Sequence, residues 1–307
     1  ERKQRSLAWF HYWQLNPKAA LAEWREAHES ALKERRIGEA RALLEQWQEI
    51  ELDEAERRRV GDALWAEAHA ALGIALWETP VAPRAPALLA AIEHLRSALQ
   101  VYTETDFPVE WAATQHNLGA AYARLPTGDR GENLRKAIEC YQNALRVRTE
   151  TDFPEDWAMT QNNLGAAYAD LPTGDRGENL RKAIECYQNA LRVYTETDFP
   201  VEWAATQHNL GAAYARLPTG DRGENLRKAI ECYQNALRVR TETDFPEDWA
   251  MTQNNLGAAY ADLPTGDRGE NLRKAIECYQ NALRVYTETD FPVEWAATQH
   301  NLGAAYA

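Results

Sequence analysis

Residues 111–122 of the chain read Trp-Ala-Ala-Thr-Gln-His-Asn-Leu-Gly-Ala-Ala-Tyr, and close copies of this segment return every 46 residues. The tryptophan that opens the segment recurs as Trp157, Trp203, Trp249 and Trp295. Residues 101–146 and 147–192 differ at only six positions, and the next 92 residues repeat this pair of units without change. A fixed period of this length indicates a solenoid, in which each unit buries its apolar face against its neighbours.

The repeat continues toward the N-terminus in weaker form, because subtracting 46 residues maps Trp111 onto Trp65 without an insertion. The chain begins without Met and stops inside a unit, so we expect a fragment of a longer protein. The aromatic run from Trp9 to Trp13 is expected to pack on the first unit, although a separate binding patch is the alternative. We predict one continuous solenoid made of a cap or junction at 1–16, a short diverged unit at 17–54, a diverged 46-residue unit at 55–100, and four and a half near-identical units at 101–307.

Each unit carries start and stop signals for two helices. Pro108 suits the first position of a helix, and the segment Leu125-Pro126-Thr127-Gly128 would end it. Asp129 stands three residues before Glu132, the spacing of a capping box, and apolar residues then recur at helical spacing. Every unit is therefore predicted to be a pair of helices.

The spacing of key residues resembles a known family. Each unit carries the tetratricopeptide pattern of Leu-Gly, Tyr, Ala, a large apolar residue and Ala, here as Leu118-Gly119, Tyr122, Ala137, Tyr141 and Ala144. Residues 17–307 resemble this family, with units longer than the usual 34 residues, similar to those of kinesin light chains and of bacterial signalling proteins. The resemblance implies an all-α fold, a right-handed superhelical solenoid of antiparallel helix pairs whose first helices line a concave surface.

Charge and hydropathy limit the class of partner. Asp and Glu number 47 against 34 Lys and Arg, giving a net charge of −13, which argues against nucleic acid or an anionic membrane as the main partner. The longest apolar run, from Ala70 to Trp77, is far shorter than the roughly 20 residues that cross a bilayer. We expect a cytoplasmic protein without a membrane partner.

Residues that could carry chemistry are too far apart to form a site. The cysteines occur once per unit, so neighbours are expected about 10 Å apart, beyond the reach of a disulfide. His116, His208 and His300 are separated by two units each and cannot share a metal ion. No nucleophile elbow or zinc motif occurs in the chain. We therefore predict a protein that is not an enzyme and has no metal site and no cofactor.

Four of the six differences between alternate units fall on one stripe of the first helix. On a helical wheel, Val109/Glu155, Ala113/Met159, His116/Asn162 and Arg124/Asp170 lie opposite the core residue Leu118. The other two differences are Glu110/Asp156 and Tyr102/Arg148. This variable stripe is either a solvated face with relaxed packing demands or a groove whose chemistry alternates from unit to unit.

Asn117 and its equivalents flank the variable stripe. The resemblance implies a ligand-binding role for them, because related repeats use an asparagine here to hydrogen-bond the backbone of a peptide; the alternative is a hydrogen bond within the protein. The predicted partner-binding groove comprises Val109, Ala113, His116, Asn117, Ala120, Arg124, Glu155, Met159, Asn162, Asn163, Ala166, Asp170, His208, Asn209, Arg216, Asn254, Asn255, Asp262, His300 and Asn301.

Three functions fit these features. The first is a protein–protein interaction scaffold that binds a peptide or a helical segment of a partner in the groove. The second is the sensor or regulatory arm of a larger signalling protein, such as a nucleotide-switch ATPase or a caspase-like protease, whose effector lies elsewhere. The third is a structural spacer that self-associates through the open C-terminal end.

Overall fold

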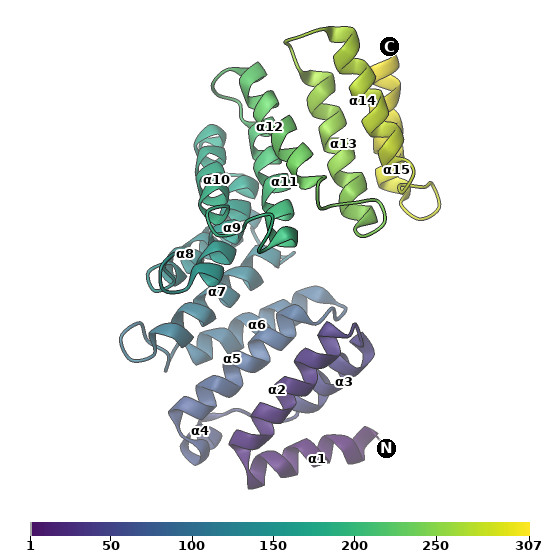
Figure 1. Cartoon of the computed structure of the whole chain (residues 1–307). Helices are drawn as coiled ribbons and strands as arrows, with labels where there is room; N and C mark the ends of the chain where they lie inside the picture. The colour runs from purple at the N-terminus through teal and green to yellow at the C-terminus, as the bar shows by residue number, and fades with distance from the viewer. Residues whose placement is uncertain (1) are drawn as a thin grey trace. The chain divides into compact units, whose positions relative to one another are not determined.

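The computed structural model describes residues 2–307, with side chains described from residue 9 onward, and every regular element in this part of the chain is an α-helix (Figure 1). The helices are α1 (Arg2–Leu15), α2 (Pro17–Lys33), α3 (Ile37–Trp47), α4 (Glu54–Val60), α5 (Asp62–Glu78), α6 (Arg84–Ala98), α7 (Pro108–Arg124), α8 (Arg130–Ala144), α9 (Pro154–Asp170), α10 (Arg176–Ala190), α11 (Pro200–Arg216), α12 (Arg222–Ala236), α13 (Pro246–Asp262), α14 (Arg268–Ala282) and α15 (Pro292–Tyr306).

Consecutive helices pack as antiparallel pairs, and the predicted all-α solenoid is confirmed (Figure 1). The first helices of the pairs are α5, α7, α9, α11 and α13, and the second helices are α6, α8, α10, α12 and α14. The chain divides into two compact units, residues 1–149 and residues 150–307. In the second unit, α10 packs on α11, α12 on α13 and α14 on α15, so each pair is covered by the next.

The predicted helix boundaries follow the local signals. Pro108 opens α7, which ends at Arg124, immediately before Leu125. The Asp129 carboxylate caps α8 by accepting a hydrogen bond from the Glu132 amide at 2.6 Å. The Glu132 side chain pairs instead with Lys136 at 2.6 Å. The N-cap was therefore predicted correctly, and the glutamate supports the helix through an ion pair one turn later.

The cap gives a direct prediction for stability. Asp221 caps α12 in the same way, at 2.6 Å from the Glu224 amide. Replacing Asp221 by alanine is expected to lower the free energy of unfolding by about 0.5–2 kcal/mol, whereas asparagine retains the acceptor and is expected to cost only a few tenths. Urea denaturation of both variants checks this, and an alanine variant as stable as the asparagine variant would contradict it.

The Leu-Gly step of each unit allows the two helices of a pair to approach closely. A Cβ atom built on Gly211 would lie 2.9 Å from the ring of Tyr233 and 3.2 Å from the Ala229 carbonyl. Tyr233 is 2% exposed and fills the space that the missing side chain leaves. Glycine is therefore required here by packing between α11 and α12, not by an unusual backbone angle.

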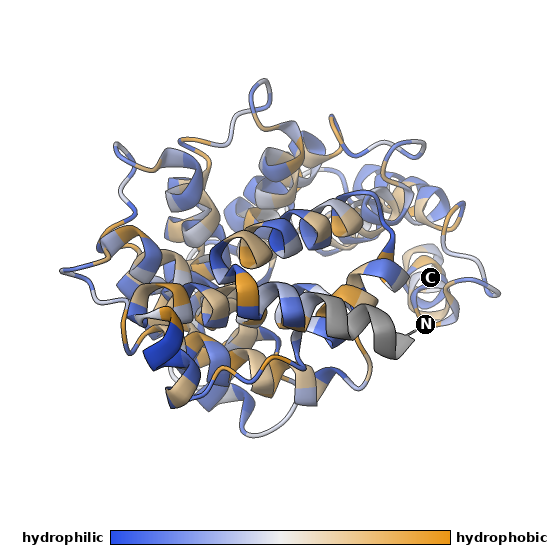
Figure 2. Cartoon of the chain, turned by 90° about the horizontal axis from the view of Figure 1, so that it is seen from below, coloured by the Kyte–Doolittle hydropathy of each residue, from blue (hydrophilic) through white to orange (hydrophobic). Residues whose placement is uncertain are grey.

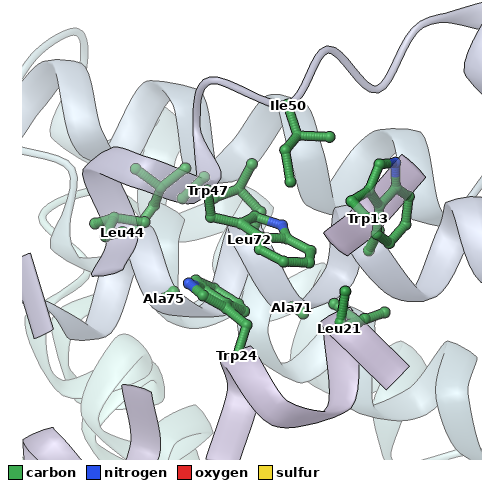
Figure 3. Packing of buried hydrophobic residues seen from close by; sticks show 13 residues of the cluster. Trp13, Leu21, Trp24, Leu44, Trp47, Ile50, Ala71, Leu72 and Ala75 are labelled. Carbon is green, nitrogen blue, oxygen red and sulfur yellow. The ribbon is translucent and has the colours of Figure 1, made fainter. Parts of the chain in front are cut away.

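A separate aromatic cluster forms the core at the N-terminal end of the first unit (Figure 3). Trp24 and Trp47 stack with ring centroids 4.7 Å apart, and Trp13 meets Trp47 edge to face at 5.4 Å. All three rings are at most 1% exposed and pack with Leu72 of α5. The N-terminal aromatic run therefore packs on the following helices, as expected.

Hydrophilic and hydrophobic residues are mixed along the helices of the described chain (Figure 2). None of the helices in this part combines the length and the apolar character that a bilayer span requires.

Candidate functional site

The structure divides the predicted groove residues into three groups by exposure. Eight are exposed, namely Val109, Arg124, Glu155, Met159, Asp170, Arg216, Asp262 and His300. Nine are half-buried, namely Ala113, Asn117, Asn162, Asn163, Ala166, Asn209, Asn254, Asn255 and Asn301. Three are buried, namely His116, Ala120 and His208. The ends of the variable stripe are therefore open, and its middle is covered in two helices.

The expectation that His116 and His208 face the open groove is wrong. His116 is 4% exposed and His208 6%, and Ala120, one turn after His116 on α7, is 1% exposed. The helical wheel assumed that a first helix has one buried side. In the second unit α11 also contacts α13, the first helix of the next pair, and this second contact covers His208. The His116 ring lies against the Tyr141 ring of its own helix pair, with centroids 5.5 Å apart.

A polar network joins His208 of α11 to the next pair. Its Nδ1 lies 3.0 Å from the Thr252 hydroxyl, and its Nε2 lies 3.5 Å from Nδ2 of Asn255. The Thr252 hydroxyl donates to the Asp248 carbonyl at 2.7 Å and accepts from Arg240 at 3.1 Å. Thr252 therefore has no further proton to give, so His208 Nδ1–H donates to it and Nε2 accepts from Asn255. The histidine is neutral and holds one tautomer.

The alternate contact, between α9 and α11, is built from different residues. Asn162 stands in place of the histidine, and its side-chain amide lies 3.3 Å from the Thr206 hydroxyl. That hydroxyl donates its proton to the Glu202 carbonyl at 2.7 Å, so it is an acceptor for the amide of Asn162. Tyr194 stands in place of Arg240, and both side chains are buried, at 6% and 8% exposed. Along the chain, the contact that contains His208 also contains Arg240, and the contact that contains Asn162 also contains Tyr194. Part of the alternation is thus an internal fit between neighbouring pairs, which neither interpretation of the variable stripe had considered.

Burial and the nearby Arg240 charge lower the pKa of His208 from 6.5 to about 3. The unfolded chain then binds more protons than the folded chain between these values, so stability is full above pH 6.5 and falls as the pH decreases. The expected loss is about 1.4 kcal/mol per pH unit for one proton. Replacing His208 by asparagine, the residue at the equivalent position of α9, should remove this loss. Urea denaturation at pH 7, 6, 5 and 4 measures both proteins, and parallel pH profiles would contradict the assignment.

Asp170 and Asp262, at the C-terminal ends of α9 and α13, pair with Arg216 at the end of α11 and with Arg222 at the start of α12. Arg216 lies 3.9 Å from Asp170 and donates to the Ala169 carbonyl at 3.3 Å, and Arg222 pairs with Asp262 at 3.3 Å. These side chains are about half exposed, and such pairs contribute about 1 kcal/mol or less. A charged group of a partner could therefore replace one member of such an ion pair at little cost in free energy.

A cavity of about 300 Å³ lies beside these charges in the second unit. It opens between α11, α12 and α13. Its lining comprises Ala212, Ala215, Arg216, Arg222, Leu226, Tyr233, Asn255, Ala258, Ala259 and Asp262. The small alanine side chains leave space beside α12. The Asn255 amide and the charged groups of Arg216, Arg222 and Asp262 surround that space. Three predicted groove residues, Arg216, Asn255 and Asp262, are thus brought together.

A second cavity, of about 340 Å³, lies in the first unit between α2, α5 and α7. It contains Ala113 and Asn117 from the predicted groove. Its other lining residues, which sequence reasoning missed, are Arg25, Glu67, Ala70, Ala71, Ile74, Tyr102, Glu110 and Thr114. Tyr102 and Glu110 could have been found, because both are among the six differences between units. Arg25 and Glu67 belong to the diverged repeats and carried no such signal.

The cysteines Cys140, Cys186, Cys232 and Cys278 are free and buried. Burial raises the pKa of each thiol to about 12, so the reactive thiolate is disfavoured. Within the described part of the chain, no group of three or more His, Cys, Asp and Glu side chains is arranged to hold a metal ion.

No protein-family model and no curated protein sequence matches the chain. Its structure is similar to that of BtubC from P. vanneervenii, with a TM-score of 0.55 and 22% identity over 82% of this chain and 90% of that one. It is also similar to a signal transduction ATPase with a tetratricopeptide repeat sensor from Pyrococcus horikoshii, with a TM-score of 0.64 and 16% identity.

That match covers 99% of this chain and 45% of the ATPase, so the chain spans about half the length of that protein. The apo form of RapI matches with a TM-score of 0.56 and 15% identity, over 93% of each chain. Helix pairs that return every 46 residues and resemble these structures give the chain the fold of a tetratricopeptide-repeat array.

Proposed function

We propose that the chain is a protein-interaction scaffold whose first helices bind a peptide or a helical segment of a partner protein. The observation that carries this proposal is the composition of the open surface in the second unit. Met159 and Met251 are exposed at 37% and 36%, Val201 at 49%, and half-buried asparagines follow one or two turns later on the same helices. Exposed apolar side chains beside amide groups suit a peptide, which offers both apolar side chains and backbone hydrogen bonds.

Among the asparagines, Asn209 is the best candidate for a contact with a peptide backbone. Two of its equivalents already have protein partners, because Asn255 is directed toward His208 at 3.5 Å and Asn301 donates to Asn254 at 3.4 Å. Asn209 is half-buried, and it follows Val201 and Ala205 on α11. Its amide can both donate to and accept from a peptide unit.

The test is a selection of random 12-residue peptides displayed on phage, followed by calorimetry with the selected peptides. Replacing Asn209 by alanine is expected to weaken binding about fivefold, the effect of one neutral hydrogen bond worth about 1 kcal/mol. Arg227→Ala, on the exposed side of α12, is the control and is expected to leave the affinity unchanged. Unchanged affinity in the Asn209 variant removes the asparagine role, and failure to select any peptide contradicts peptide binding itself.

The second candidate is a sensor arm of a signalling protein, for which the similarity to the repeat-sensor ATPase over 99% of this chain is the supporting observation. In that case the same surface would detect the partner and pass the signal to an effector domain. The test is to measure nucleotide hydrolysis or proteolysis by the native gene product with and without a selected peptide. An activity that does not respond to the peptide would contradict this candidate while leaving the scaffold function in place.

A further inference from the structure

The 340 Å³ cavity of the first unit combines an apolar floor with a polar rim. Ala70, Ala71 and Ile74 of α5 form the apolar part, together with Ala113 of α7. The charged groups are Glu67 on α5 and Glu110 on α7, the same two helices, and Arg25 on α2. A lining of this kind suits a side chain that has a long apolar stem and a charged head.

The hydroxyl of Tyr102 is a second and independent sign that the cavity takes a ligand. Tyr102 is 6% exposed, and its ring packs against Phe107 with centroids 5.5 Å apart. Its hydroxyl has no hydrogen-bond partner among the described residues, although the side chain lines the cavity. The buried side-chain atoms without a partner in the described chain are Trp47 Nε1, Trp77 Nε1 and Gln207 Oε1, so the Tyr102 hydroxyl is not sealed in the protein and can be reached from the cavity. A ligand group can therefore take the place of water at this hydroxyl. Burial and the nearby glutamates raise the pKa of Tyr102 to about 12, so the hydroxyl is neutral and can accept from a cation.

Carboxylates exceed cations around this cavity. Arg25 pairs with Glu67 at 3.3 Å, with both side chains nearly half exposed, whereas the Glu110 carboxylate has no ion pair in the described part of the chain. An adjoining cavity of about 650 Å³ shares Arg25 and Glu67 and adds Lys33 with three glutamates. Those glutamates are Glu26, Glu29 and Glu34. One of them, Glu34, forms an ion pair with Arg36 at 3.0 Å. The remaining excess of negative charge favours a cationic group.

We propose that the Tyr102 cavity receives an arginine or lysine side chain of a partner peptide that binds the helices of the first unit, so that this partner segment is basic. This inference rests on the proposed function and adds the charge of the partner. The methylene stem lies on Ala70, Ala71 and Ile74, and the cationic head meets the carboxylates of Glu110 and Glu67. The exposed Arg25–Glu67 pair contributes little by itself, so Glu67 can turn to the incoming cation at small cost.

The experiment uses the same phage selection on the full chain, and the sequences of the selected peptides are the first result. We expect enrichment of Arg or Lys. The double variant Glu67→Gln, Glu110→Gln is expected to bind these peptides about tenfold more weakly, because charge-assisted hydrogen bonds at a partly exposed site are lost. The matched control is Glu93→Gln, Glu139→Gln, which makes the same charge change on the exposed faces of α6 and α8 and is expected to retain the wild-type affinity. Circular dichroism confirms that both variants are folded.

Tyr102→Phe tests the hydroxyl alone and is expected to weaken binding about fivefold, the effect of one neutral hydrogen bond worth about 1 kcal/mol. Raising the NaCl concentration from about 0.05 to about 0.5 M is expected to weaken the binding of these peptides to the wild-type chain, since salt screens partly exposed charges. Selected peptides that are neutral or acidic, or that bind the double variant as tightly as the wild type, overturn the basic-partner inference and leave the scaffold function standing. Selection of no peptide at all overturns the scaffold function as well.

Discussion

Replacing Trp24 by alanine is expected to lower the free energy of unfolding of the first unit by about 3–5 kcal/mol. The indole is 1% exposed, stacks on Trp47 with centroids 4.7 Å apart, and donates to the Leu43 carbonyl at 3.0 Å. Alanine would leave a cavity and would remove the hydrogen bond from the indole to the Leu43 carbonyl. Close-packed neighbours fill such a cavity only in part, so most of the lost contact energy is not recovered.

Urea denaturation gives the size of this effect, and hydrogen exchange read by mass spectrometry gives its location. Exchange is expected to accelerate in α2, α3 and α5, which share the aromatic cluster. Leu15→Ala is the control, because Leu15 is 86% exposed and its truncation is expected to change stability by less than about 0.5 kcal/mol. A Trp24 variant with the same unfolding midpoint as the Leu15 variant would show that the cluster does not stabilise the first unit.

Replacing Gly211 by alanine is expected to destabilise the second unit by about 1–3 kcal/mol, although alanine is the better helix former. The added methyl would lie 2.9 Å from the Tyr233 ring and 3.2 Å from the Ala229 carbonyl, below normal contact distances. The ring is buried and cannot move aside without disturbing its neighbours, and a backbone carbonyl yields even less. The expected strain therefore exceeds the gain of about 1 kcal/mol in helix propensity.

The chain offers its own control for this prediction. Gly303 occupies the equivalent position of α15, where an added Cβ atom would have no neighbouring atom within 4 Å. Gly303→Ala is expected to leave stability unchanged or to raise it by up to about 1 kcal/mol, because only helix propensity acts there. Thermal and urea denaturation compare the two variants. Destabilisation of both to the same extent would mean that packing against tyrosine is not the reason why glycine recurs at this position of each unit.

The pairing of helices could be predicted from local signals in each unit. Pro108 begins α7, and Asp129 caps α8 at 2.6 Å from the Glu132 amide. These effects act over one helical turn, so they depend on the order of residues alone. The period of 46 residues further predicts that each helix pair packs against the next, because a repeat buries its apolar face against its neighbours. The helix pairs and their stacking can therefore both be predicted without any knowledge of tertiary contacts.

The chemistry of the predicted groove followed from the sequence only in part. The outer positions of the variable stripe, such as Val109 and Asp170, are exposed as expected. His208 is buried because the first helix of the next pair covers it, and its partners Thr252 and Arg240 lie far along the chain. A wheel drawn for one helix contains no information on which further helix will pack on it.

The sequence alone therefore determined the helix pairs, their caps and the repeating order of the stack, because each arises from interactions within a unit or between near-identical neighbours. The buried His208 network and the Tyr102 cavity arose only on folding. Both combine residues from different repeats, and the cavity draws Arg25 and Glu67 from diverged repeats that lack the regular pattern. Their meeting depends on how the helices pack in three dimensions, which periodicity along the chain does not specify.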